Sequence, residues 1–574
     1  MRIGRPFVSG WLILGLAALA LSSLLAFFLV LCRLPGVKLC GGGGFATLLV
    51  YHVDFAVLVW FLAMAGTFLS VTGPVGRWQW LALPLVWGGA LALLLAPLQE
   101  QPMPVLTNYF PVLATPIFLG GMGAMGVGAL ILVVERLRYG ATSPGVIVAA
   151  LAIVCALLAF VVSGVRLSPV SLRDPATLES LFWGGGHLLQ HAHVLLLASV
   201  WIWLRQETDP AFAPARWIHG WFGLALLPSV AGLFLVAGEP HDLTTLMRWG
   251  SWWVVPGVGW LLLLAWRARG VGEEPWIWLS LLLLLVGLAV GTVVREATVL
   301  VPAHYHGAVG AVTLGYMGLA HRLLGPQDDT HKPGWLPYLF AGGVLLLVAG
   351  LTFAGYSGLP RKTPGMDHPW EGETRLAIVL AVSGGVLSAV GSLLFALRAL
   401  RLWWRQRTSL GHGGLLGLTL LAIAAVAAAI EIWPSGQKVV TTPVQTELHR
   451  RFEQGVVMLH AKQYEHAVTA FHWVLKQAPN MPEAHVNMGY AMLGLGKAKA
   501  AGDFFQGAIA LRPFQANAYY GLAQSLEAQG ELHAALGAMR SFIHLTRSED
   551  PFLPKARAAL WEWESRLRTP DPKP

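Results

Sequence analysis

Charged residues are scarce in this chain of 574 residues, at 12% of the total, and there are only three cysteines, Cys32, Cys40 and Cys155. Such low charge, together with long apolar runs, excludes a disordered chain. Three cysteines are too few for a small domain held together by disulfides. They form no CxxC, no CxxCH and no cluster with metal-ligand spacing, which argues against covalently attached haem c and against thiolate-bound metal.

Long apolar runs dominate what is present, and 55% of all residues are hydrophobic. A helix crosses the bilayer core with about 20 apolar residues. Runs of that length predict thirteen spanning helices, at approximately 8–33, 46–71, 77–96, 108–134, 144–166, 179–204, 217–238, 247–267, 275–298, 302–324, 335–356, 374–400 and 413–433. The sequence therefore predicts an all-α, polytopic membrane helix bundle.

Basic residues predict the orientation of these spans. The net charge is +9, and many basic side chains flank the apolar runs on one side: Arg2, Arg5, Arg77, Arg136, Arg138, Arg205, Arg216, Arg267, Arg269, Arg322, Lys332, Arg398, Arg401, Arg405 and Arg407. Because basic loops stay in the cytoplasm, we expect everything after Pro434 on the outer side, the periplasm of a bacterial inner membrane. Cys32 and Cys40 would lie near the first outer loop, as a disulfide or as two free thiols. Because these basic residues flank membrane spans, the net positive charge does not indicate a nucleic-acid partner.

A repeat of 34 residues follows the last span. Four positions of the repeat carry similar residues at intervals of 34. They are Gly455, Gly489 and Ala523; Ala467, Ala501 and Ala535; Phe471, Phe505 and Met539; and Pro479 with Pro513. This resembles three tetratricopeptide repeats, where small residues let paired helices approach and prolines end each unit. We expect a membrane domain at 1–433, a linker at 434–446 and a soluble α-solenoid at 447–574 that binds a protein or peptide partner.

Histidines within the apolar region are the candidate functional residues, because ionisable groups inside a membrane are costly and are by default functional. Six are expected near the outer ends of their segments: His52, His187, His191, His241, His304 and His306. They come from four segments at one depth, which is typical of a single site assembled from several helices. The competing interpretation of each is a hydrogen bond between helices.

The spacing of these histidines indicates which of them can bind the same metal ion or cofactor. His187 and His191 are four residues apart, about 40° in azimuth on a helix, so both can reach one metal ion. His304 and His306 are about 200° apart, so one helix can hold a flat cofactor on each face. His193 points elsewhere, and we interpret it as a packing residue.

The order of these segments resembles the haem-copper oxidase superfamily, the catalytic subunits of cytochrome c oxidases and nitric oxide reductases. The matching segments are Trp183-Gly184-Gly185-Gly186-His187, His241, Pro256-Gly257-Val258, Ala303-His304-Tyr305-His306 and Gly358-Leu359-Pro360-Arg361-Lys362. The resemblance covers the first twelve spans and implies a twelve-helix core that holds two haems and one further metal.

By this resemblance, His52 and His306 would hold a low-spin haem, and His304 a high-spin haem where the substrate binds. Two imidazoles saturate the iron for electron transfer, whereas one leaves a position open for a diatomic gas. Arg361 and Lys362 would neutralise haem propionates, unless they are ordinary interfacial anchors.

The second metal, copper or non-haem iron, would be held by His187, His191 and His241 opposite the haem on His304. Oxidases of the family commonly carry a tyrosine where His191 stands, and no tyrosine occurs from 179 to 270. The expected histidine pair is reduced to His241, and the usual inner proton-channel residues are missing. These departures favour a nitric oxide reductase and argue against proton pumping.

Taken as a whole, the resemblance predicts a respiratory oxidoreductase that passes electrons from an outer donor such as cytochrome c to O2. Reduction of NO is the alternative. A hypothesis from another class is a haem-binding membrane scaffold or sensor that recruits partners through its repeats. This chain has neither a CxxCH motif nor a copper-binding cysteine pair. The electron donor or an accessory subunit must therefore carry its own cofactor.

Overall fold

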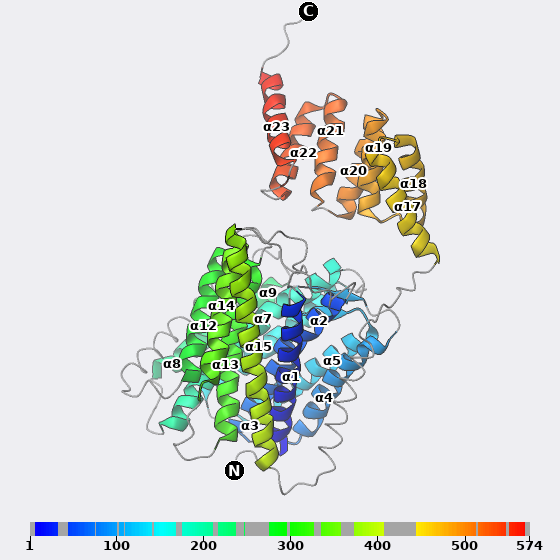
Figure 1. Ribbon diagram of the computed structural model, residues 1–574. Helices are drawn as coiled ribbons and strands as arrows, with labels where there is room; N and C mark the ends of the chain where they lie inside the picture. The colour runs from blue at the N-terminus through cyan, green and yellow to red at the C-terminus, as the bar shows by residue number, and fades with distance from the viewer. Residues whose placement is uncertain are drawn as a thin grey trace, which may run out of the picture. The chain divides into compact units, whose positions relative to one another are not determined.

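The computed structural model describes residues 6–32, 44–74, 76–99, 103–107, 109–140, 143–167, 175–209, 216–236, 246, 275–294, 299–325, 334–356, 372–406, 443–512, 515–546, 550 and 552–568. The chain divides into two compact units, Met1–Pro434 and Ser435–Pro574. The first is a bundle of long apolar helices, and the second is a row of shorter amphipathic helices (Figure 1).

Long helices make up the first unit, because backbone groups inside a membrane must be satisfied within their own segment. Several begin on a proline, whose fixed φ suits the first helical position. In chain order they are α1 (Pro6–Leu31), α2 (Gly44–Val53), the π-helix η1 (Asp54–Val59), α3 (Trp60–Val71), α4 (Gln79–Leu95), the short 3₁₀ helix η2 (Ala96–Leu98), α5 (Pro116–Tyr139), α6 (Pro144–Arg166), α7 (Pro175–Thr208), α8 (Arg216–Ala225), α9 (Leu227–Leu235), α12 (Pro275–Val293), α13 (Leu300–Leu324), α14 (Leu336–Tyr356) and α15 (Gly372–Gln406).

Ten segments among the described residues are long and apolar enough to cross a membrane, which agrees with an all-α membrane bundle. They correspond to ten of the thirteen predicted spans. The predicted span at 302–324 forms helix α13, but its histidines and glycines leave it less apolar than these ten. The predicted spans at 247–267 and 413–433 lie outside the described residues.

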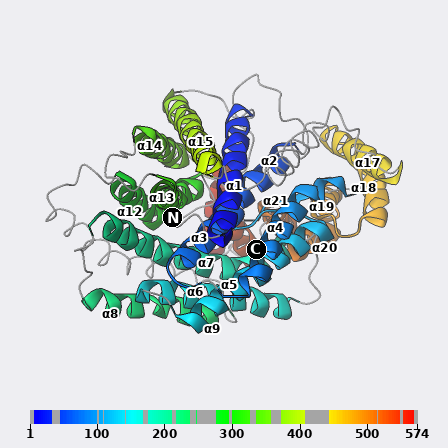
Figure 2. The same ribbon diagram turned by 90° about the horizontal axis from the view of Figure 1, so that it is seen from below.

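Helix α13 packs against α12, α14, α7 and α15, and most of its side chains are buried. Helices α12 to α15 lie together on one side of α1 (Figure 2). Where α12 meets α13 the backbones nearly touch, since a Cβ on Gly307 would lie 2.6 Å from the Cα of Gly287. Small residues at such crossings let membrane helices approach closely.

A short antiparallel hairpin interrupts the helices between α4 and α5. Strands β1 (Pro104–Val105) and β2 (Val112–Leu113) pair Pro104 with Leu113 and Val105 with Val112. Their connection carries Tyr109 against α7. Near the end of α1, Cys32 takes part in a disulfide, whereas Cys155 is a free thiol; Cys40 lies outside the described residues.

Consecutive helices of the second unit pack against one another: α17 (Pro443–His460), α18 (Tyr464–Gln477), α19 (Pro482–Gly494), α20 (Ala498–Leu511), α21 (Ala516–Ala528), α22 (Leu532–Leu545) and α23 (Leu553–Arg568). Helices α18, α20 and α22 begin 34 residues apart, and so do α19 and α21.

Contacts in the second unit repeat with the same period. A Cβ on Gly455 would meet the Phe471 ring at 2.7 Å, and a Cβ on Gly489 would meet the Phe505 ring at the same distance. In the third repeat, Ala523 and Met539 belong to one buried cluster. Each small residue therefore makes room for the large residue 16 positions later.

Candidate functional site

Five of the predicted site histidines lie on three described elements. His52 is on α2, His187 and His191 are on α7, and His304 and His306 are on α13. His241, the basic pair Arg361 and Lys362, and the segment Pro256-Gly257-Val258 lie outside the described residues.

Two of these histidines are anchored on a neighbouring helix. His52 Nδ1 lies 3.0 Å from the carbonyl oxygen of Ser22 on α1, and the Ser22 hydroxyl donates in return to the His52 carbonyl at 3.1 Å. His304 Nδ1 lies 2.8 Å from the carbonyl oxygen of Gly287 on α12. These bonds fix the orientation of both rings.

Two more are anchored on their own helix. His187 Nδ1 lies 2.8 Å from the Trp183 carbonyl oxygen, and His306 Nδ1 lies 2.6 Å from the Pro302 carbonyl oxygen. The His306 ring also stacks on Tyr305, with ring centroids 5.1 Å apart. The same nitrogen thus faces a carbonyl oxygen in all four histidines.

This shared arrangement decides the tautomer of the four rings. A carbonyl oxygen only accepts, so a hydrogen bond to it needs the proton on Nδ1 and leaves Nε2 unprotonated in the neutral ring. At His52 the Ser22 hydroxyl also lies 3.2 Å from the same nitrogen. Histidines that bind metals through one nitrogen almost always donate the other N–H in this way. All four residues are half-buried.

His191 and His193 behave differently, although they share α7 with His187. His191 is 6% exposed, and its Nε2 lies 2.8 Å from the Ala225 carbonyl oxygen at the end of α8. His193 is 5% exposed, contacts Phe61, and lies with Nδ1 3.3 Å from the Tyr316 hydroxyl. His193 is a packing residue, as the sequence predicted. Like His52 and His304, His191 therefore bonds to a carbonyl on another helix, and it differs from them in being buried and in donating through Nε2.

Aromatic rings enclose His187 on two sides. The ring centroid of Trp183 is 4.6 Å from that of His187, and the ring centroid of Tyr109 is 4.7 Å away. Tyr109 also covers the backbone of Gly186, because a Cβ there would come within 2.4 Å of its ring.

Tyr109 is a residue that the sequence did not single out. It lies in the hairpin connection before α5, outside the stretch from 179 to 270 that contains no tyrosine. The only available signal was Gly186, because a glycine directly before a candidate ligand indicates a close approach by another group.

Gly291 is a second residue that the sequence did not single out, and it leaves space for the His304 ring. A Cβ on Gly291 would lie 2.6 Å from His304 Nδ1, so this glycine makes room for the imidazole. Gly287 and Gly291 form a GxxxG pair on α12, a recognisable motif for close helix packing.

Asp54 is the most unusual polar residue near the site. It begins the π-helix η1, is 0% exposed, and neither carboxyl oxygen has a hydrogen-bond partner among the described residues. π-Helical turns occur frequently at functional sites. The sequence signal for it is an acidic residue within an apolar run.

The described residues contain no group of three or more His, Cys, Asp or Glu side chains placed to hold a metal ion. His187, His191 and His304 therefore do not form such a group by themselves. The three-histidine set expected from the sequence also needs His241, which lies outside the described part of the chain.

No family model matches the chain. It is 23% identical over 491 residues to the uncharacterized protein RP382 of Rickettsia prowazekii (strain Madrid E), covering 68% of this chain and 94% of that protein. Among solved structures it is similar to a haem-copper terminal oxidase dimer, with a TM-score of 0.46 and 18% identity over 69% of this chain and 84% of that one. At these levels neither similarity assigns a family or an activity to this chain.

Proposed function

We propose that this protein is a haem-containing membrane oxidoreductase of the haem-copper oxidase type. One observation carries the proposal: four half-buried histidines inside an apolar bundle donate through Nδ1 to backbone carbonyls and so carry an unprotonated Nε2. Unprotonated imidazole nitrogen is the form that binds iron or copper.

His52 and His306 are the proposed axial ligands of a low-spin haem, and His304 is the proposed ligand of a high-spin haem. When bound, the first haem would carry electrons and the second would leave one position open to a small gas. Ser22, Gly287 and the carbonyl of Pro302 hold the three imidazoles in place. Arg361 and Lys362 are proposed to neutralise haem propionates.

The second metal, copper or non-haem iron, is proposed to bind opposite His304. His187 supports this, because its Nδ1 lies 2.8 Å from the Trp183 carbonyl oxygen, which leaves Nε2 as the nitrogen for a metal. His241 remains the proposed partner ligand. We assign His191 a weaker role, since its side chain is 6% exposed whereas His187 is half-buried.

We propose O2 as the substrate. The argument for NO rested on a missing tyrosine and on missing proton-channel residues. Tyr109 answers the first, because it places a phenol ring 4.7 Å from the His187 ring. A phenol beside the centre would hold a proton within reach of the reacting gas. Electrons would come from an outer cytochrome or accessory subunit. The second unit, proposed to be three tetratricopeptide repeats on the periplasmic side, would recruit that partner.

The proposal is tested on the purified full-length protein. We expect two haems and one copper or iron per chain, with consumption of O2 faster than that of NO. His52→Ala should remove the low-spin absorption and keep part of the high-spin signal, while His193→Ala, the packing control, should keep both. Low-spin absorption that survives in His52→Ala would refute the assignment.

A haem-binding scaffold or sensor without catalysis is the second candidate. It is favoured by the single His241 that stands where the haem-copper oxidase family has a histidine pair. Metal analysis separates the two functions. Two haems without a second metal, and no gas consumption, would establish the scaffold.

A further inference from the structure

Two pairs of an arginine and an aromatic residue form a patch at one end of the bundle. Arg77 and Trp78 lie between α3 and α4, and Arg138 and Tyr139 end α5. The guanidinium carbon of Arg77 lies 5.3 Å from the centroid of the Trp78 ring, and that of Arg138 lies 6.0 Å from the centroid of the Tyr139 ring. Trp78 is 44% exposed and Tyr139 is 45% exposed. This arginine–aromatic patch therefore presents two cations and two aromatic rings at the surface.

A buried polar contact brings the two pairs together. Glu135 lies one helical turn before Tyr139, is 3% exposed, and accepts through Oε1 from the backbone N–H of Trp78 at 2.8 Å. Gly76 lies against the second pair, because a Cβ there would come within 2.6 Å of the Tyr139 ring. The segment that carries Arg77 is thus fixed on the last turn of α5.

The charge of the patch is positive. Glu135 is the only acidic residue in the stretches 73–81 and 130–140, and it is buried and bonded to the backbone. Arg77 and Arg138 are both exposed. A guanidinium presents several N–H donors in a fixed plane, which matches the oxygen atoms of a phosphate group. The patch is therefore suited to an anionic ligand that carries phosphate.

Exposed apolar side chains border the patch. Leu81 on α4 is 46% exposed, and Val134, one turn before Arg138 on α5, is 50% exposed. Trp80 is also exposed, and its ring packs edge to face on Phe7 of α1 with centroids 4.7 Å apart. Exposed tryptophan and tyrosine are typical of the level at which a membrane meets water. Hydrocarbon surface next to a cation matches a ligand with an anionic head and acyl chains.

We propose that the arginine–aromatic patch binds the phosphate group of an anionic phospholipid. Its two arginines bind the phosphate oxygens, its two rings lie at the level of the headgroups, and the acyl chains run past Leu81 and Val134. Basic residues beside membrane helices attract anionic lipids. The orientation predicted from the sequence places this end of the bundle on the cytoplasmic side. The inference is independent of haem, second metal and substrate.

The test is photo-crosslinking of lipid probes to the full-length protein in phosphatidylcholine nanodiscs. A phosphatidylglycerol probe and a phosphatidylcholine probe carry the same photoreactive acyl chain and are added at the same low concentration. Peptide mass spectrometry measures the labelling of residues 78–84 and 130–139. We expect about 25-fold more labelling by phosphatidylglycerol, because each of two basic side chains should favour an anionic lipid by about fivefold.

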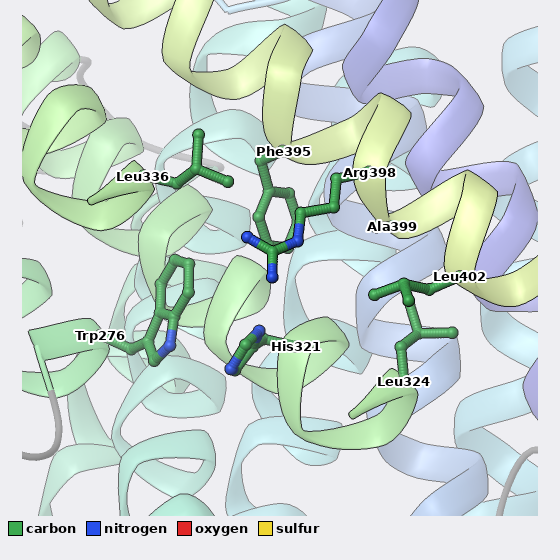
Figure 3. A pocket seen from close by; sticks show the side chains of 8 residues that line it. All are labelled: Trp276, His321, Leu324, Leu336, Phe395, Arg398, Ala399 and Leu402. Atoms are coloured by element: carbon green, nitrogen blue, oxygen red, sulfur yellow. The ribbon is translucent and has the colours of Figure 1, made fainter. Parts of the chain in front are cut away.

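Arginine variants locate the effect. Arg77→Gln and Arg138→Gln should each lower labelling by phosphatidylglycerol about fivefold. Arg398→Gln is the matched control, because Arg398 is also exposed and is expected on the same side of the membrane. It lines a different part of the bundle, together with Trp276 and His321 (Figure 3). This variant should leave labelling of the patch unchanged.

Three outcomes would contradict the proposal. Equal loss of labelling in Arg398→Gln and Arg77→Gln would show a diffuse charge effect and overturn the site. Equal labelling by the two probes in the unaltered protein would show that no headgroup is recognised. Loss of labelling when inorganic phosphate is added at the concentration of the probe would show that free phosphate is the ligand, and would refute the lipid assignment.

Discussion

Gly291 on α12 provides the space in which the His304 imidazole lies. A Cβ at residue 291 would come within 2.6 Å of Nδ1, the nitrogen that donates to the Gly287 carbonyl. The ring cannot retreat without breaking this bond. The position of a candidate haem ligand on α13 thus depends on a missing side chain on α12.

Gly291→Ala is therefore expected to displace His304 and to lower high-spin haem occupancy. Loss of a supporting contact to a metal ligand typically lowers affinity by roughly 10-fold or more. Haem content and the high-spin absorption band measure the effect. Gly342→Ala on α14 is the control, because a Cβ there meets nothing within 4 Å. Normal haem content in Gly291→Ala would mean that His304 does not need this space.

His187 and His191 are expected to differ in what their loss removes. His187→Ala should lower second-metal content, because His187 is half-buried and its Nδ1 faces the Trp183 carbonyl oxygen, which leaves Nε2 for a metal. His191→Ala should mainly lower thermal stability, by about 0.6 kcal/mol for one hydrogen bond between membrane helices. Metal analysis and thermal unfolding of both variants distinguish the metal-binding role from the structural role. Equal metal loss in the two variants would restore the three-histidine set expected from the sequence.

Asp54 is expected to destabilise the bundle in which it lies. Its carboxyl group is buried without a hydrogen-bond partner among the described residues, which costs about 1–3 kcal/mol. Asp54→Val should therefore raise the melting temperature of the purified protein. Asp54→Asn keeps the polar group and should give little gain. A lower melting temperature in both variants would show that the carboxyl group makes a stabilising contact.

The repeats of the second unit suggest a paired substitution. Gly489→Ala should destabilise that unit by about 1–3 kcal/mol, because its Cβ would overlap the Phe505 ring, 2.7 Å away. The third repeat has Ala523 and Met539 at the equivalent positions. Gly489→Ala combined with Phe505→Met should therefore recover much of the loss.

Denaturant unfolding of the full-length protein, followed through the second unit, measures this coupling. Gly537→Ala is the control, since a Cβ on this helical glycine meets nothing within 4 Å. If the effects of Gly489→Ala and Phe505→Met simply add, the two positions are not coupled as the repeat predicts.

Elements that depend on local pattern were predictable from the sequence. About 20 apolar residues in a row can only cross a membrane as a helix, and ten predicted spans reappear among the described residues. The 34-residue period reappears in the helix starts, because each helix pair repeats the same local contacts. Charged residues are scarce in most spans, so the few histidines there were conspicuous.

The tertiary structure decided which of those histidines resemble ligands. Their hydrogen-bond partners lie far away in the chain, as Ser22 does from His52, Gly287 from His304 and Ala225 from His191. Spacing along one helix shows which side chains share a face, but not which carbonyl the neighbouring helix presents to them. Only the packing of α1 on α2, α12 on α13 and α8 near α7 sets those partners, and with them the nitrogen that each ring leaves unprotonated.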